Sequence, residues 1–305
     1  MNIDKIGEFG LIDRIKKIVA DPVIGDDTAP LIIGGETYLT TVDILLEDQH
    51  FLRNYPAYKV GYKAISINVS DIVASGGHPL WALVSLMLPN IETKYVDELY
   101  RGMTAACRFY GLKIVGGNIT RSIKIGIDVF MIGKTKKFIG RTSVKNGDNI
   151  FLTGTLGDSK AGLELLLLKK KSYEDFEKKL IEKHLSPKIN FKVADYLCSN
   201  ASAALDISDG LSSDLSHLGS KSKIRIDIKG KNIPISKELI MFCKKYKHNP
   251  IEYAVAGGED YQILFTQNLK SNVQSSKYFL IGKVSSGHGI YLDNKKLENK
   301  SFHHF

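Results

Sequence analysis

The stretch "YKVGYKAISINVSDIVASGG", residues 58–77, decides the fold because it combines a buried helix pattern with polar groups on a neighbouring face. Its apolar residues follow the i, i+4, i+7, i+8 spacing of one helix face: Ile65, Val69, Ile72 and Val73. Asn68 and Asp71, three residues apart, share the adjacent face. A carboxylate beside a buried stripe costs free energy unless it is paired or coordinated. The stretch therefore predicts a core helix, ending at paired glycines, whose acid needs a partner.

Further helices and strands surround this helix. The spacing of apolar residues predicts helices at 8–20, 94–111, 157–171, 172–184 and 187–200, and one from residue 209. Apolar runs bounded by turn residues predict strands at 30–45 (two strands around a Gly-Gly turn), 81–88, 112–118, 123–135, 149–154 and 203–207. Strands and helices mix without a strict β-α-β rhythm, which predicts the α+β class.

Two features refine this plan. The strand at 112–118 is expected to run into a loop at Gly116-Gly117. The turn-rich segment that follows residue 138 predicts a domain boundary there, with an N-terminal domain at 1–138 and a C-terminal domain at 139–305.

Composition limits the classes of protein. The chain has 305 residues, of which 43% are hydrophobic and 25% charged, so it can bury a large core. The sequence shows no apolar run as long as a membrane span and no signal-peptide pattern at its start, which predicts a cytoplasmic protein. Cys107, Cys198 and Cys243 are far apart and form no CxxC pair, so neither a zinc site nor a disulfide framework is indicated.

The net charge of +9 leaves a basic nucleic-acid-binding protein as one alternative. The lysines are scattered, and clustered aspartates repel phosphates unless they hold metal, so no nucleic-acid partner is expected. The tripeptide "GKT" (133–135) resembles the end of a P-loop, but Asp128 stands where that motif needs glycine. A GxGxxG loop between a strand and a helix is also missing, so any nucleotide is bound by other means.

Aspartates recur in small-residue loops beside the predicted elements. They are Asp26, Asp27, Asp43, Asp71, Asp206 and Asp209. Each alone has a plain structural explanation, such as a helix cap at Asp209 or a turn at Asp27. Together they indicate hard oxygen ligands of the kind that Mg²⁺ with a polyphosphate requires.

Read in order, these loops resemble the thiamine-monophosphate kinase family. The motifs that carry the resemblance are "GEFGLIDRI", "IGDDTAPL", "TTVDILLEDQHF", "GYKAISINVSDIVASGGHP", "GGNITRS", "GRTSVKNGD", "LTGTLGDSKAGLELL", "ALDISDGLSSDLSHL" and "GGEDYQILFT". The likeness extends from residue 7 to residue 265. It implies an aminoimidazole ribonucleotide synthetase-like fold, with an N-terminal α/β domain whose mixed sheet pairs across a homodimer and a C-terminal α+β domain. It also implies the conversion of ATP and thiamine monophosphate to ADP and thiamine diphosphate with several Mg²⁺ ions.

The resemblance assigns roles residue by residue. It implies Mg²⁺ ligands at Asp27, Thr41, Asp43, Asp71, Asn118, Asp206 and Asp209, with Asp26 orienting its neighbour or binding a metal through water. It implies ATP contacts at Gly117, Asn118, Arg141 and Ser208, and thiamine-phosphate contacts at His50, Glu259 and Phe302. A residue acting as covalent or general-base catalyst is not expected, because the acceptor phosphate is already ionised. Taken singly, His50, Glu259 and Arg141 are also compatible with surface positions.

Two positions depart from the family pattern and concern the same presumed ion. Asn118 replaces the usual aspartate with a neutral oxygen, which predicts a weaker metal site. Val42 replaces the usual threonine and leaves only a backbone carbonyl as a ligand. Related superfamily enzymes that act on a ribonucleotide or on a selenium or carbamoyl donor remain the nearest alternative, although no reactive cysteine loop is present and "GGEDY" with His50 favours thiamine phosphate.

Overall fold

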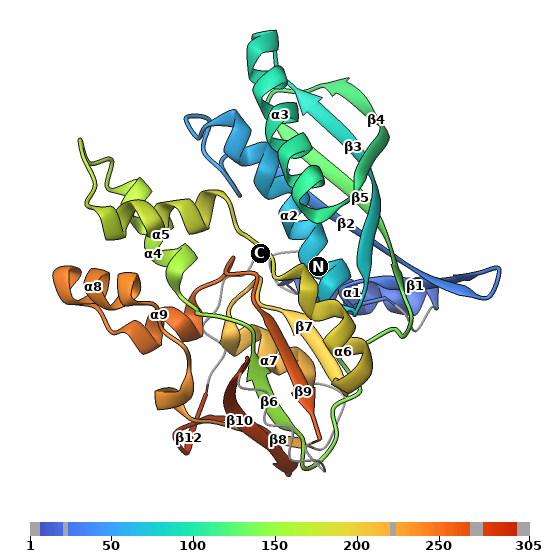
Figure 1. The fold of residues 1–305 in the computed structure, drawn as a ribbon, viewed down its shortest axis with the longest axis vertical. Helices are drawn as coiled ribbons and strands as arrows, with labels where there is room; N and C mark the ends of the chain where they lie inside the picture. The colour runs from blue at the N-terminus through green and yellow to red at the C-terminus, as the bar shows by residue number, and fades with distance from the viewer. Residues whose placement is uncertain (1–6, 21–23, 220–223, 269–276, 298–305) are drawn as a thin grey trace.

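The computed structural model describes residues 7–20, 24–219, 224–268 and 277–297, which form two sheets with helices packed on them (Figure 1). The first sheet contains β1 (Ala29–Ile33), β2 (Glu36–Leu46), β3 (His78–Leu88), β4 (Lys113–Arg121) and β5 (Gly126–Thr135). Its order is β1-β2-β5-β3-β4, and β3 and β4 form its parallel pair. Helices α2 (Ala57–Ala74) and α3 (Thr93–Tyr110) cover one face, and α1 (Gly7–Val19) lies below β2 in the view.

Helix α2 is buried along almost its whole length, as its stripe predicts. Its contact with α3 is unusually close and depends on two glycines. A Cβ on Gly102 would lie 1.8 Å from the backbone oxygen of Tyr58, and one on Gly61 would lie 2.0 Å from that of Leu99. Only glycine allows the two backbones to approach this far. Helix α2 is therefore fixed between α3 and the sheet.

The other face of the first sheet carries no helix among the described residues. We call this surface the open face; its exposed or half-exposed apolar side chains are Val42, Ile44, Trp81, Leu83, Val115, Phe130 and Ile132. An apolar groove runs over it between β3, β4 and β5. Contiguous apolar surface of this kind is typical of an interaction site.

The second sheet comes from the C-terminal half. It contains β6 (Asn149–Leu152), β7 (Ala203–Asp206), β8 (Ile224–Ile228), β9 (Ile263–Gln267), β10 (Phe279–Ser286), β11 (Gly289–Leu292) and β12 (Lys295–Lys296). The order is β12-β11-β8-β10-β6-β9-β7, with β8 and β11 parallel. The accompanying helices are α4 (Asp158–Leu167), α5 (Asp175–Leu185), α6 (Ala194–Asn200), α7 (Leu211–Gly219), α8 (Lys237–Tyr246) and α9 (Pro250–Ala256), with 3-10 turns η2 (Phe191–Val193) and η3 (Gly230–Asn232).

The halves share a core. Phe151 and Phe265 of the second sheet belong to the same buried cluster as Ile65 and Ile72 of α2. The chain passes from one sheet to the other between Thr135 and Asn149. In the described parts of the chain, no helix is long and apolar enough to cross a membrane.

The α+β prediction is confirmed, and three details differ. The predicted loop at Gly116-Gly117 is wrong, because β4 continues through both glycines. A Cβ on Gly117 would lie 1.8 Å from the carbonyl oxygen of Val84, so glycine serves close strand pairing here and not a turn. The three helices predicted over 157–200 are shorter than expected, and α7 begins at Leu211, two residues after Asp209.

Candidate active site

One cavity of about 810 Å³ lies where β2 and α2 meet loops of the C-terminal half. Most of the site residues expected from the sequence line it: Asp27, Thr41, Asp43, His50, Asp71, Arg141, Asp206, Ser208, Asp209 and Glu259. Acidic side chains that are spread along the sequence from Asp27 to Glu259 are thus collected in one place.

Strand alternation and helix periodicity bring the first acids together. Thr41 and Asp43 occupy the face of β2 that looks toward α2, whereas Val42 points to the open face. The hydroxyl of Thr41 donates to Asp71 Oδ2 at 2.6 Å, and the backbone N–H of Asp43 donates to Asn68 Oδ1 at 3.2 Å. The polar face of α2 predicted from its sequence is therefore paired with β2.

A carboxylate cluster lies at the centre of the cavity. Oxygens of Asp27, Asp71 and Asp206 lie within 4.8 Å of one another. Burial, and then mutual repulsion, raise the pKa of Asp71 well above its usual range and that of Asp206 to about 8. Asp27 Oδ2 and Asp206 Oδ2 are buried without a hydrogen-bond partner among the described residues. Buried, clustered and incompletely hydrogen-bonded carboxylates are suited to binding a cation.

Arg141 partly offsets this negative charge. Its guanidinium hydrogen-bonds to Asp27 Oδ1, and its backbone N–H donates to the carboxylate of Asp26 at 3.2 Å. Burial raises the pKa of Asp27 to about 6 in spite of the arginine. Burial lowers the pKa of Arg141, but the two aspartates outweigh it and the net shift is upward. Arg141 therefore remains a cation against the wall of the cavity.

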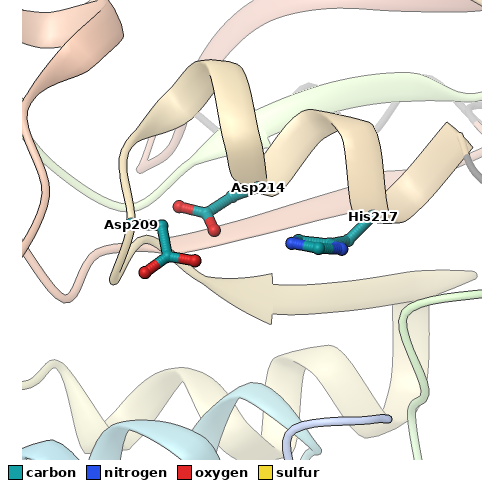
Figure 2. A group of neighbouring side chains, drawn as sticks. All are labelled: Asp209, Asp214 and His217. Atoms are coloured by element: carbon teal, nitrogen blue, oxygen red, sulfur yellow. The ribbon is translucent and has the colours of Figure 1, made fainter. Parts of the chain in front are cut away.

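A second cluster adjoins the first at the start of α7. Oxygens of Asp209 and Asp214 and a ring nitrogen of His217 lie within 4.8 Å of one another (Figure 2). Asp214 is buried and accepts a hydrogen bond from Gly210 N at 3.0 Å. Burial and the carboxylate of Asp209 raise the pKa of Asp214, and burial with nearby Arg141 lowers that of His217 to about 4. His217 is thus a neutral imidazole.

The far end of the cavity is charge-balanced. Glu259 Oε1 accepts from Lys63 Nζ at 2.6 Å, and its Oε2 lies 3.4 Å from His184 Nδ1. Burial raises the pKa of Glu259, but Lys63 and His184 outweigh it and leave the net pKa lowered. Glu259 adopts a left-handed backbone with φ of 63°, a conformation that costs a residue other than glycine about 1–3 kcal/mol. At the same end, His50 Nδ1 accepts a hydrogen bond from Leu46 N at 3.0 Å, which leaves Nε2 as the ring nitrogen that can carry a proton.

Two expected site residues lie elsewhere, and a third is not described by the structure. Gly117 and Asn118 occupy the exposed edge strand β4 and do not line the cavity of this chain. Phe302 lies outside the described residues.

The structure also adds residues that the sequence interpretation did not assign. Asp214 and His217 are three apart on one helix, a spacing that could have been noticed beside Asp209. Lys63 and His184 gave no such signal, because their partner Glu259 is distant in the sequence.

The donor set fits a hard divalent cation. Carboxylates of Asp27, Asp71 and Asp206 could hold it, with Asp43 and the hydroxyl of Thr41 beside them. Oxygen ligands of this kind suit Mg²⁺. Two unpartnered buried oxygens in the cluster are consistent with such an ion.

Comparison with known proteins identifies the family. Residues 25–135 match the model of "AIR synthase related protein, N-terminal domain". A thiamine-monophosphate kinase of Aquifex aeolicus is 49% identical over 306 residues, covering 100% of both chains. The chain belongs to the thiamine-monophosphate kinase family. A second family member, from Haemophilus influenzae, is 31% identical over 86% of this chain and 81% of its own.

A solved structure of the thiamine-monophosphate kinase family extends the comparison. It is described as "AaThiL complexed with AMPPCP and TMP" and superposes with a TM-score of 0.97 at 49% identity. The match covers 100% of this chain and 99% of that chain. The family predicted from the loops is therefore confirmed, as is its α+β fold.

Proposed function

We propose that the protein transfers the γ-phosphoryl group of ATP to the phosphate of thiamine monophosphate, giving ADP and thiamine diphosphate. The observation that carries this proposal is the convergence of the acidic loops on one cavity, in a chain 49% identical to a thiamine-monophosphate kinase. The related AaThiL structure is a complex with AMPPCP and TMP, molecules of the same two classes. A cytoplasmic location is part of this proposal.

The chemistry is an in-line displacement. A phosphate oxygen of thiamine monophosphate forms a bond to the γ-phosphorus, and the bond from that phosphorus to the β,γ-bridging oxygen breaks, with its electron pair leaving on ADP. The attacking oxygen is already ionised at neutral pH, so no general base is required. The protein must align two polyanions and offset their repulsion.

The acidic clusters are proposed to hold the cations that this alignment needs. Asp27, Asp71 and Asp206 form one set of ligands with Thr41 and Asp43, and Asp209 contributes from the second cluster. When bound, Mg²⁺ neutralises phosphate charge and orients the oxygens of the transferred group. Asp26 is proposed to orient Arg141 by accepting a hydrogen bond from the backbone N–H of Arg141.

The two reactants are proposed to enter from opposite ends of the cavity. Arg141 supplies a fixed guanidinium, and Ser208 a hydroxyl, for ATP phosphates. His50 and Glu259 are proposed to contact thiamine monophosphate, with Phe302 adding an aromatic contact.

A homodimer would complete this site. Val42 and Ile44 belong to the open face and also line the cavity. A second copy that covers the open face therefore comes next to the cavity, and we propose that its edge strand brings Gly117 and Asn118 to the nucleotide.

We expect Trp81→Glu to give monomers in sedimentation and to reduce turnover. A dimer unchanged by Trp81→Glu and Leu83→Glu would argue against this interface.

The decisive experiment is phosphate transfer from ATP to thiamine monophosphate, with and without Mg²⁺ and with thiamine as a control acceptor. Thiamine diphosphate should form only from the monophosphate and only with the metal. Product from thiamine but none from its monophosphate would overturn the choice of substrate.

A further inference from the structure

Lys63, Glu259 and His184 form a cluster that metal and phosphate chemistry does not use. Lys63 comes from α2, His184 from α5, and Glu259 from the loop between α9 and β9. One oxygen of the Glu259 carboxylate accepts a hydrogen bond from Lys63 Nζ at 2.6 Å. The other oxygen lies 3.4 Å from His184 Nδ1. Each carboxylate oxygen thus has one nitrogen of the protein beside it.

The three residues of the cluster lie at different depths behind the cavity wall. Glu259 and His184 line the cavity, whereas Lys63 does not. The side chain of Lys63 is 4% exposed and that of Glu259 is 27% exposed. The ammonium therefore lies behind the carboxylate, and the carboxylate meets the contents of the cavity.

The histidine adds a second polar atom at this wall. His184 Nδ1 also lies 3.0 Å from the hydroxyl of Ser159, while its Nε2 is buried with no hydrogen-bond partner among the described residues. Burial first, and then the charge of Lys63, lower the pKa of His184 to about 4, so the ring is neutral. With its proton on Nδ1 facing the carboxylate, Nε2 is an acceptor.

A plain structural role, an ion pair joining the two halves of the chain, would not need this arrangement. The backbone N–H of Glu259 donates to Ser208 O at 2.7 Å, and this bond holds the residue in its left-handed conformation. That conformation and Lys63 together fix a carboxylate at the cavity wall with lone pairs to spare. A charge pair kept only for stability could be buried fully.

We propose that Lys63 and His184 are positioning residues that hold Glu259 as an ionised acceptor for the amino group of the substrate's aminopyrimidine. The inference rests on the proposed function, because it assigns a role to one end of the same cavity. A carboxylate only accepts hydrogen bonds, so this end selects a heterocycle that presents N–H donors. It rejects the analogue in which a carbonyl oxygen replaces the amino group.

The test compares thiamine monophosphate with oxythiamine monophosphate, which carries that carbonyl. The wild-type enzyme should prefer the amino form in kcat/KM by about a hundredfold or more. Lys63→Met should raise KM for thiamine monophosphate about tenfold or more and reduce this preference, with KM for ATP unchanged. Lys63→Arg should restore both values, and His184→Gln should lower the preference.

Two further variants keep the test independent of folding. Lys59→Met removes an exposed ion pair one turn earlier on α2 and should leave all constants unchanged. Glu259→Gln keeps the size of the side chain and should reduce the preference by itself. Added to Lys63→Met, it should restore thermal stability but not the preference.

The two proposals fail in different ways. An inactive wild-type enzyme would remove the proposed function. An active enzyme in which Lys63→Met and Glu259→Gln both keep the wild-type preference for the amino form would overturn the positioning role alone. A loss of preference in Lys63→Met that Lys63→Arg does not recover would do the same.

Discussion

The two ends of the cavity treat buried carboxylates in opposite ways. Asp71 and Asp206 are surrounded by like charges and have raised pKa values, whereas Glu259 has its own lysine and a lowered pKa. The aspartate end therefore keeps uncompensated negative charge that suits a bound cation, whereas the chain itself balances the charge at the glutamate end. The same chemical group can serve either role, and its neighbours decide which.

Asp71→Asn should have the largest effect at the aspartate end. Loss of one ligand charge should reduce turnover by about a hundredfold to a thousandfold, because transition-state charge is less well offset. The metal-free fold should be as stable as the wild type or more stable, because repulsion within the cluster falls. Steady-state transfer assays and thermal unfolding in chelator check both. Near-normal turnover would count heavily against the metal assignment.

At the balanced end, Lys63→Met should have the opposite effect on stability. It leaves a largely buried carboxylate without its cation, which should cost about 3 kcal/mol or more of the free energy of unfolding. Lys59→Met, whose ion pair is exposed, should cost no more than about 1 kcal/mol. Urea unfolding of the two variants measures the difference. Equal losses would show that the ends are not distinct.

Mg²⁺ should stabilise the folded protein through the aspartate end of the cavity and not through the glutamate end. Adding Mg²⁺ at a hundred times its dissociation constant should raise the free energy of unfolding by about 2.7 kcal/mol, and chelator should remove the gain. Asp71→Asn should gain much less, while Lys63→Met should gain as much as the wild type. Thermal shift titrations with Mg²⁺ test this. A gain of wild-type size in Asp71→Asn would contradict it.

The pH dependence of the metal-free protein gives a further test of the aspartate end. The pKa of Asp206 is raised from 3.8 to about 8, so the folded state keeps a proton that the unfolded chain has lost. Stability from this group is complete below about pH 4 and is lost as the pH rises toward about 8. Unfolding in chelator across this range should show the slope, and Asp206→Asn should reduce it. An unchanged slope would mean that Asp206 is not the group responsible.

The sequence predicted the aspartate end well. Loop aspartates beside short elements have a local signature, and the family resemblance assigned Asp43 and Asp71 to one ligand set. In the structure β2 and α2 bring these two segments together. Gly116-Gly117 misled because a glycine pair signals a turn as readily as close strand pairing. Only the neighbouring strand distinguishes the two.

The glutamate end could not be predicted in the same way. Lys63 looks like an ordinary helix lysine, and its partner stands 196 residues further along the chain. Which lysine is buried against which acid depends on how the two halves pack. A local pattern contains no information on that packing, so the resemblance could indicate Glu259 but not the residues behind it.

Helix α2 sets a fixed distance between the two ends of the cavity. Lys63 and Asp71 are eight residues apart on it, and a helical rise of 1.5 Å per residue separates them by about 12 Å along the axis. Because Gly61 and Gly102 fix α2 against α3, the positions of Lys63 and Asp71 are held relative to each other. If the acceptor binds as proposed, with its phosphate at the aspartates and its ring at Glu259, this fixed spacing would select acceptors by length. A shorter acceptor would leave its phosphate remote from the aspartates, and a longer one would displace its ring from the glutamate.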